Sequence, residues 1–172
     1  MFDGTEPGTA AAVRAEWRAE EEAWTRAAYE RWEHARTLAD VARDCMHRGD
    51  LATFSVASVT ITGVIVAVGT DLVRVATVDG GVDIALHAGS ELVVRILPGH
   101  DRGTRGDGTV TTFAARLREL EGARVDLGVT GNDARRGRLH LGQQQVSLVD
   151  DDGIRVYMPT ASVAWVRPVD VD

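Results

Sequence analysis

Lysine is absent from this chain of 172 residues, so all 19 basic residues are arginine. The single cysteine, Cys45, excludes an internal disulfide bond and agrees with a reducing compartment. No apolar run approaches the roughly 20 residues that span a bilayer, and the first residues lack the basic segment of a secretion signal. These absences predict a cytoplasmic protein that does not enter a membrane.

Signatures of common catalytic and nucleotide-binding sites are also missing. The sequence contains no Walker A motif, no Gly-x-Ser-x-Gly and no His-Glu-x-x-His. Asp44, Cys45 and His47 are the best candidates for metal ligands. Residues two apart on a helix point to different sides, however, so Cys45 and His47 could not bind one ion there. We therefore predict that the protein is not an enzyme, and we expect no catalytic residue, cofactor or metal.

The charge distribution limits the partners. The formal net charge is −7 and no segment is strongly basic, so nucleic acid is not the expected partner. One basic cluster consists of Arg135, Arg136 and Arg138, which we interpret as part of a solvated hairpin, with phosphate contact as the alternative. The acidic run Asp150 to Asp152 is interpreted as a solvated turn, because three successive side chains diverge.

A degraded internal repeat organises most of the chain. The stretch Gly63 to Arg95 returns as Gly137 to Arg167, with matched glycines, an Asp-Gly pair, a serine and a final Val-Arg at a nearly constant offset. Such self-similarity is typical of duplicated modules. Both copies are dense in Val and Ile and are interrupted by Gly or Asp-Gly, as expected of short strands joined by tight turns.

The predicted fold class is mainly β with α: a long N-terminal helix and two tandem five-stranded barrels of the SH3-like or Sm-like kind, the second preceded by a short helix. The expected parts are the N-terminal helix at 1–50, the first barrel at 51–97, a Gly-rich linker at 98–108, and a helix plus the second barrel at 109–172. Strands are expected near 52–58, 60–68, 71–78, 82–87, 91–96, 123–130, 135–142, 145–149, 153–158 and 163–167. The short helix is expected at 109–121, capped by Thr109, Thr111 or Thr112.

The N-terminal helix is predicted to run without a break from Ala10 to about His47, because this stretch lacks Gly and Pro and is rich in Ala, Glu and Arg. Apolar residues recur along it at seven-residue spacing, with a second stripe beside them, which is typical of a helix that packs on another helix. The predicted partner interface consists of Trp17, Trp24, Trp32 and Leu38. The alternative is that the helix packs on the protein's own barrels.

The sequence resembles a family of uncharacterised actinobacterial proteins, some of them labelled transcriptional regulators. The resemblance rests on the acidic helix rich in Trp, Ala, Glu and Arg, on Gly63 to Arg95, on a second helix, and on the ending Ser162 to Arg167. The module also resembles the Sm and Hfq RNA-binding barrels. It departs from their motifs, since no Asn follows Asp71 in the expected loop and Arg95 is followed by Ile, so their RNA contacts are not transferred.

The predicted function is a non-enzymatic binding or scaffolding protein. Its partner would be another protein or a second copy of the chain, bound through the N-terminal helix, and we expect no contact with membranes. The alternative is a regulator that binds RNA or DNA through Sm-like barrels.

Overall fold

The computed structural model describes residues 7–87, 92–99, 103 and 112–169. The chain divides into two compact units, residues 1–37 and residues 38–172. The first contains helix α1 (Pro7–Ala35), and the second begins with helix α2 (Leu38–Arg48). We call these the helical unit and the sheet unit.

The prediction of one unbroken helix is wrong at Arg36 and Thr37, which separate α1 from α2. The sequence Thr37-Leu38-Ala39-Asp40 fits the Ser/Thr-x-x-acid pattern that starts helices. A threonine hydroxyl that can satisfy free backbone N–H groups favours a new helix start at this point. Because strong helix formers lie on both sides of Thr37, the composition of the segment did not indicate a break.

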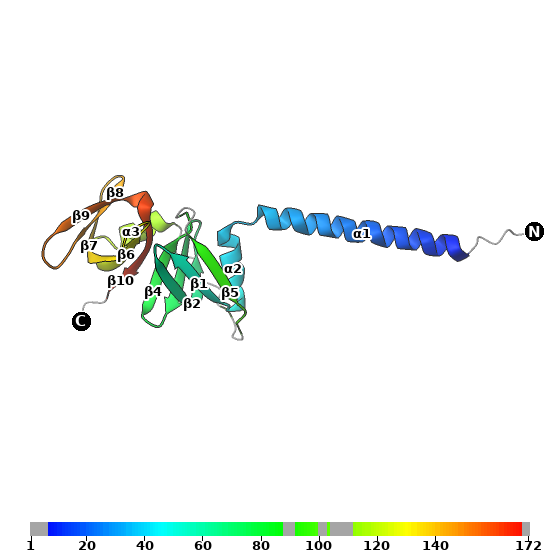
Figure 1. The fold of residues 1–172 in the computed structure, drawn as a ribbon, viewed down its shortest axis with the longest axis horizontal. Helices are drawn as coiled ribbons and strands as arrows, with labels where there is room; N and C mark the ends of the chain where they lie inside the picture. The colour runs from blue at the N-terminus through cyan, green and yellow to red at the C-terminus, as the bar shows by residue number, and fades with distance from the viewer. Residues whose placement is uncertain (1–6, 88–91, 100–102, 104–111, 170–172) are drawn as a thin grey trace, which may run out of the picture. The chain divides into compact units, whose positions relative to one another are not determined.

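The sheet unit contains ten strands in two sets of five, drawn in Figure 1. The first set consists of β1 (Leu51–Val56), β2 (Val59–Val68), β3 (Leu72–Thr77), β4 (Gly80–Ala85) and β5 (Val93–Leu97). The second set follows helix α3 (Phe113–Glu119) and consists of β6 (Arg124–Val129), β7 (Arg135–Leu141), β8 (Gln145–Val149), β9 (Arg155–Pro159) and β10 (Val163–Pro168). The strand bounds lie within two residues of the predicted ones, whereas α3 begins four residues after the predicted start at 109.

All ten strands belong to one antiparallel sheet, in the order β5-β1-β2-β3-β4-β10-β6-β7-β8-β9. Within each set the order is the same: the fifth strand lies beside the first, followed by the second, third and fourth. The two sets meet where β4 pairs with β10, with Ile84 opposite Trp165 and Asp83 opposite Val166. Figure 1 shows these two strands side by side at the centre of the sheet unit.

The structure does not confirm two separate closed barrels. Among the described residues no ladder joins β4 to β5, or β9 to β10, so neither set closes on itself through strand pairing. The sequence pattern correctly predicted the strands of each set. It did not show that an edge of one set would pair with an edge of the other.

Several predicted turns are present. A two-residue turn joins β3 to β4, and Gly80 there has φ +109°. A short 3₁₀ turn at Thr160–Ser162 follows Pro159 and precedes β10. Thr112, one of three candidate caps, accepts a hydrogen bond from the Ala115 N–H at the start of α3. Residues 88–90, at the corresponding place before β5, and most of the 98–108 linker lie outside the described residues.

The core of the sheet unit consists of the inward-facing residues of both sets together with one face of α2 and of α3. Helix α2 packs on β2 and β3 and buries Ala42, Cys45 and Met46. Helix α3 buries Phe113 and Leu117 and contacts β4. In the described part of the chain, no helix is long and apolar enough to cross a membrane.

Candidate functional site

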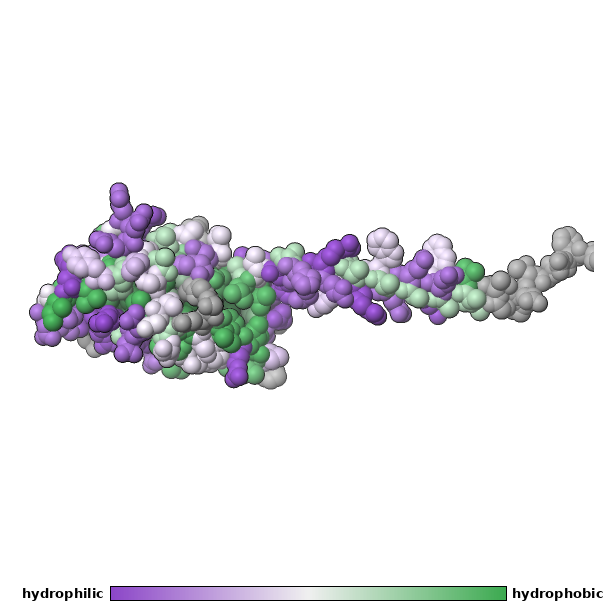
Figure 2. Space-filling model, turned by 45° about the horizontal axis from the view of Figure 1, so that its top comes forward, coloured by the Kyte–Doolittle hydropathy of each residue, from purple (hydrophilic) through white to green (hydrophobic). Residues whose placement is uncertain are grey.

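Trp17 and Trp24 on α1 are the most exposed of the predicted interface residues, and each side chain is 72% accessible. Seven residues are close to two helical turns, so the two indoles lie near one line on the helix surface. Ala28 continues this line one turn further on, and Arg31 interrupts it. Figure 2 shows purple hydrophilic surface between paler patches along α1. Within the helical unit this indole pair is uncovered.

Trp32 and Leu38 differ from that pair. Trp32 packs against its neighbours on the helix, since its ring lies 5.7 Å from the Tyr29 ring and the Arg36 guanidinium lies 4.4 Å above it. The hydrogen bond from Tyr29 to Glu33 raises the pKa of the tyrosine. Leu38 is the first residue of α2 and belongs to the sheet unit. The structure therefore brings Trp17 and Trp24 into one stripe, and the helix break separates Leu38 from them.

Two buried carboxylates bind arginines, and the sequence analysis missed both. Asp83 on β4 is almost fully buried, and its two oxygens accept hydrogen bonds of 2.7 Å from the Nε atoms of Arg74 and Arg116. Arg116 lies on α3, so this cluster connects the helix that precedes the second set to β4, the fourth strand of the first set. A single Asp inside the apolar run Val82 to Ile84 was the available signal, because a lone charge in a buried strand needs a partner.

Asp126 on β6 forms the second cluster. Its carboxylate accepts hydrogen bonds from Arg136 at 2.6 and 2.9 Å, and from Arg167 at 2.6 and 3.2 Å. These bonds, the Arg136 bond above all, lower the pKa of Asp126 despite its burial, which acts in the opposite direction. Arg138 donates at 2.8 Å to the Gly122 carbonyl. Two of the three arginines in the predicted basic cluster thus bind groups of the protein itself.

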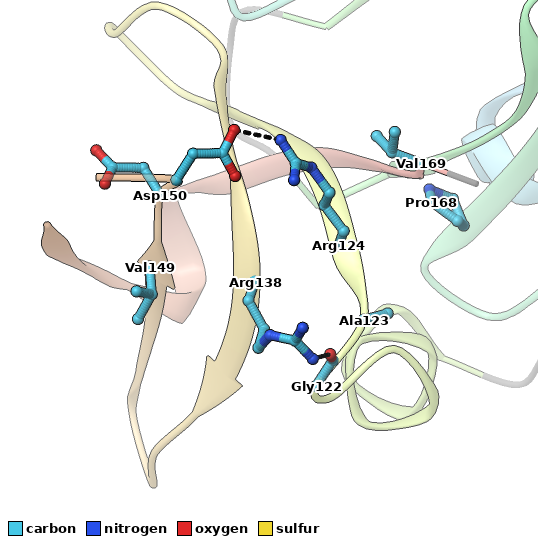
Figure 3. Close-up of a pocket in the computed structure, with 9 residues that line it drawn as sticks. Gly122, Ala123, Arg124, Arg138, Val149, Asp150, Pro168 and Val169 are labelled. Atoms are coloured by element: carbon cyan, nitrogen blue, oxygen red, sulfur yellow. Dashed lines mark hydrogen bonds and ion pairs between the residues drawn. The ribbon is translucent and has the colours of Figure 1, made fainter. Parts of the chain in front are cut away.

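Figure 3 shows a hollow beside β6, β7 and the β8–β9 turn, into which Arg124 and Arg138 extend. Its volume is about 590 Å³. Arg124 is ion-paired with Asp151 across this hollow, while Arg138 reaches toward the Gly122 carbonyl. Both guanidinium groups thus already bind acceptors that line the hollow, namely the Asp151 carboxylate and the Gly122 carbonyl.

The acidic run 150–152 has a local structural role. Asp150 Oδ1 accepts hydrogen bonds from the N–H groups of Asp152 and Ile154, at 3.1 and 2.8 Å, which closes the turn between β8 and β9. Asp151 instead turns toward Arg124. The first two carboxylates of the run therefore have different partners, in agreement with the turn interpretation.

The other candidate ligands are also separated. Cys45 is fully buried, and burial raises the pKa of its thiol, whereas His47 is exposed. Asp50, five residues after Cys45, accepts bonds from Arg48 and from the Gly99 N–H, and the Arg48 bond lowers its pKa. Within the described ranges no group of three or more His, Cys, Asp or Glu side chains could hold a metal ion.

Comparison of this sequence with family models and with curated proteins finds no match. The geometry described above is therefore the basis for a functional proposal.

Proposed function

We propose that this protein is a non-enzymatic binding or scaffolding protein, in which α1 binds a protein partner or a second copy of the chain. The observation that carries the proposal is the exposure of Trp17 and Trp24 on one line of the helix. Fully burying a large apolar side chain stabilises a complex by roughly 1.5–3 kcal/mol. A helix that covers both indoles therefore gains several kilocalories per mole, and tryptophan is enriched among binding hot spots.

We further propose that the sheet unit consists of two copies of one small five-stranded module, of the SH3-like or Sm-like class. The shared strand order supports this, and so does the register at corresponding positions. Thr53 lies opposite Arg95 on the first and fifth strands of one set, and Asp126 lies opposite Arg167 on those of the other. Both arginines end the Val-Arg pair that the sequence repeat aligns.

A protein partner fits the charges better than RNA or DNA does. The chain carries a net charge of −7, and binding a polyanion needs cations that are free to contact phosphate. Arg136 and Arg138 are bound to Asp126 and Gly122, and Arg124 is bound to Asp151. Nucleic-acid binding through these three arginines would first have to break these contacts.

The test replaces both exposed indoles, as Trp17→Ala with Trp24→Ala, in the full chain. Alanine is a stronger helix former than tryptophan, so the substitution preserves α1. We expect sedimentation equilibrium to show self-association weakened by at least about tenfold for each indole, the equivalent of about 1.4 kcal/mol apiece. The matched control is Glu22→Ala with Arg26→Ala, which alters the opposite face without changing net charge.

Equal weakening by the control pair would contradict the role of the tryptophan face. If the full chain and the tryptophan variant have the same association state, self-association through α1 is wrong and the partner is a different protein. Salt-sensitive, sub-micromolar binding of RNA or DNA in a filter-binding titration would instead support the nucleic-acid alternative.

A further inference from the structure

The stripe that contains Trp17 and Trp24 also carries two opposite charges. Glu20 lies four residues before Trp24 and Arg31 lies seven residues after it, which places both within about 40° of Trp24 around the helix. Both side chains are exposed, and within the described part of the chain no hydrogen bond or ion pair joins either of them to another residue. When a partner covers the tryptophans, each charge needs a partner of opposite sign, because an unpaired buried charge is costly.

A parallel, in-register pair of α1 helices would place like charges together. Glu20 would face Glu20 of the second copy, and Arg31 would face Arg31 of the second copy. Glu16 and Glu21, which flank the stripe on its two sides, would also meet between the copies. These three repulsions disfavour the parallel arrangement.

An antiparallel arrangement pairs the same charges with opposite ones. If Trp24 of one copy lies level with Ala27 of the other, then Glu20, four residues before Trp24, lies level with Arg31, four residues after Ala27. Glu20 and Arg31 also lie on the same side of Trp24 around the helix, so they meet on the same side of the contact. The two-fold axis between the copies repeats this contact, so all four charges are paired.

This register also matches large side chains with small ones. Trp24 faces Ala27 of the second copy, so the indole packs where the opposite side chain is a single methyl group. Three residues further out from the charged pair, Trp17 lies level with His34. Along the stripe, therefore, no charge faces another of its own sign.

We propose that the partner of α1 is a second copy of this chain, bound antiparallel, with Glu20 of each copy paired with Arg31 of the other. The inference rests on the proposed function, from which it selects self-association, and it adds the orientation and the register. Arg31, which interrupts the line of apolar residues, then serves to set that register, as single polar residues do in helix pairs. Because the contact joins the same surface of both copies, association stops at a dimer.

Charge reversal in the full chain tests the pairing by sedimentation equilibrium. Glu20→Arg and Arg31→Glu each place like charges opposite each other, so each should weaken the dimer by at least about tenfold. The double variant exchanges the two charges and restores both pairs, so it should associate within about threefold of the unsubstituted chain. In a parallel pair, by contrast, all three variants would keep like charges together and would associate alike.

The matched control is Glu22→Arg with Arg26→Glu, which reverses a similar pair of charges on the opposite face of α1 and should leave association unchanged. Glu and Arg have similar helix propensities, so α1 remains helical in every variant, which circular dichroism checks.

A spin label attached at Glu16→Cys measures the orientation directly. In the antiparallel dimer the two labels lie about 28 Å apart along the helix axis, whereas in a parallel dimer they lie level with each other. Cys45 is fully buried, so the unsubstituted chain should take up no label and serves as the control.

The outcomes separate this inference from the proposed function. A dimer that is insensitive to the single charge reversals, or whose labels lie level, overturns the antiparallel register and leaves association through the tryptophans in place. A monomeric unsubstituted chain overturns the inference together with self-association through α1, and the partner is then a different protein.

Discussion

At the residue scale, the close contact between Gly128 and Trp165 excludes any side chain at position 128 in the observed packing. The two residues are paired across β6 and β10, and a Cβ atom at Gly128 would overlap the pyrrole edge of the indole. Trp165 Nε1 is buried and has no hydrogen-bond partner among the described residues. The absence of a side chain at position 128 thus creates the space in which this tryptophan packs at the junction of the two strand sets.

We predict that Gly128→Ala destabilises the protein by about 3 kcal/mol, because neither the buried indole nor the strand can move away without losing contacts. Urea unfolding measures the change. Gly81→Ala is the control, since nothing lies within 4 Å of a Cβ atom at that position. A loss at Gly128 no larger than the loss at Gly81 would show that the indole is not confined as described.

Asp126 gives the protein a defined sensitivity to acid. The bonds from Arg136 and Arg167 lower its pKa in the folded state, whereas an unfolded Asp titrates near about 3.9. The ion-pair contribution is therefore complete above the unfolded pKa. It is lost as the pH falls through the lowered, folded-state pKa.

For Asp126→Asn we predict a loss of about 1–3 kcal/mol at neutral pH and a flatter dependence of stability on pH below about pH 5. The magnitude allows for the solvent access of Arg136, more than half of whose side chain is exposed. Urea midpoints measured from neutral to acidic pH provide the readout. Asp151→Asn, at an exposed ion pair, should cost about 0–1 kcal/mol. Parallel pH profiles for wild type and Asp126→Asn would contradict this account.

At the scale of the element, the β1–β2 turn contains backbone strain. Ala57 and Ser58 have φ of 47° and 62°. This is the left-handed conformation, which residues other than Gly, Asn and Asp adopt only at an energetic cost. Two successive residues of this kind form the turn that matches the twist of antiparallel strands. The twist of the hairpin therefore imposes a conformation for which its turn residues are poorly suited.

Ser58→Gly is predicted to stabilise the protein by about 1 kcal/mol, because glycine adopts this conformation without a steric cost. Thermal unfolding followed by circular dichroism should show a higher Tm. Asp79→Gly in the β3–β4 turn is the matched control. Asp79 has no positive φ, so glycine there adds only unfolded-state entropy and should not raise the Tm. Equal effects at the two turns would contradict the strain argument.

For the helices, local sequence predicted that they exist but not where the N-terminal one is divided. Their existence followed from composition, because Ala, Glu and Arg favour helix and Gly49 stops it. The division between α1 and α2 did not follow, although Thr37 and Asp40 provided a start signal. That division matters for the candidate site, because it places Leu38 outside the stripe that contains Trp17 and Trp24.

At the scale of the whole molecule, the proposed partner contact lies in the helical unit, whereas the strands and the two carboxylate–arginine clusters lie in the sheet unit. Trp17 and Trp24 would bind through burial of indole rings.

The sequence by itself determined the strands, most turns and the repeat, because alternation, glycine positions and Val-Arg pairs act over a few residues. Only the tertiary structure decided that β4 pairs with β10, that Asp83 and Asp126 each bind two arginines, and that the ten strands form one sheet. Pairing between edges depends on which strands remain unpaired after each set has formed. This pairing joins residues about 80 positions apart, such as Ile84 and Trp165, so a pattern within a few residues does not predict it.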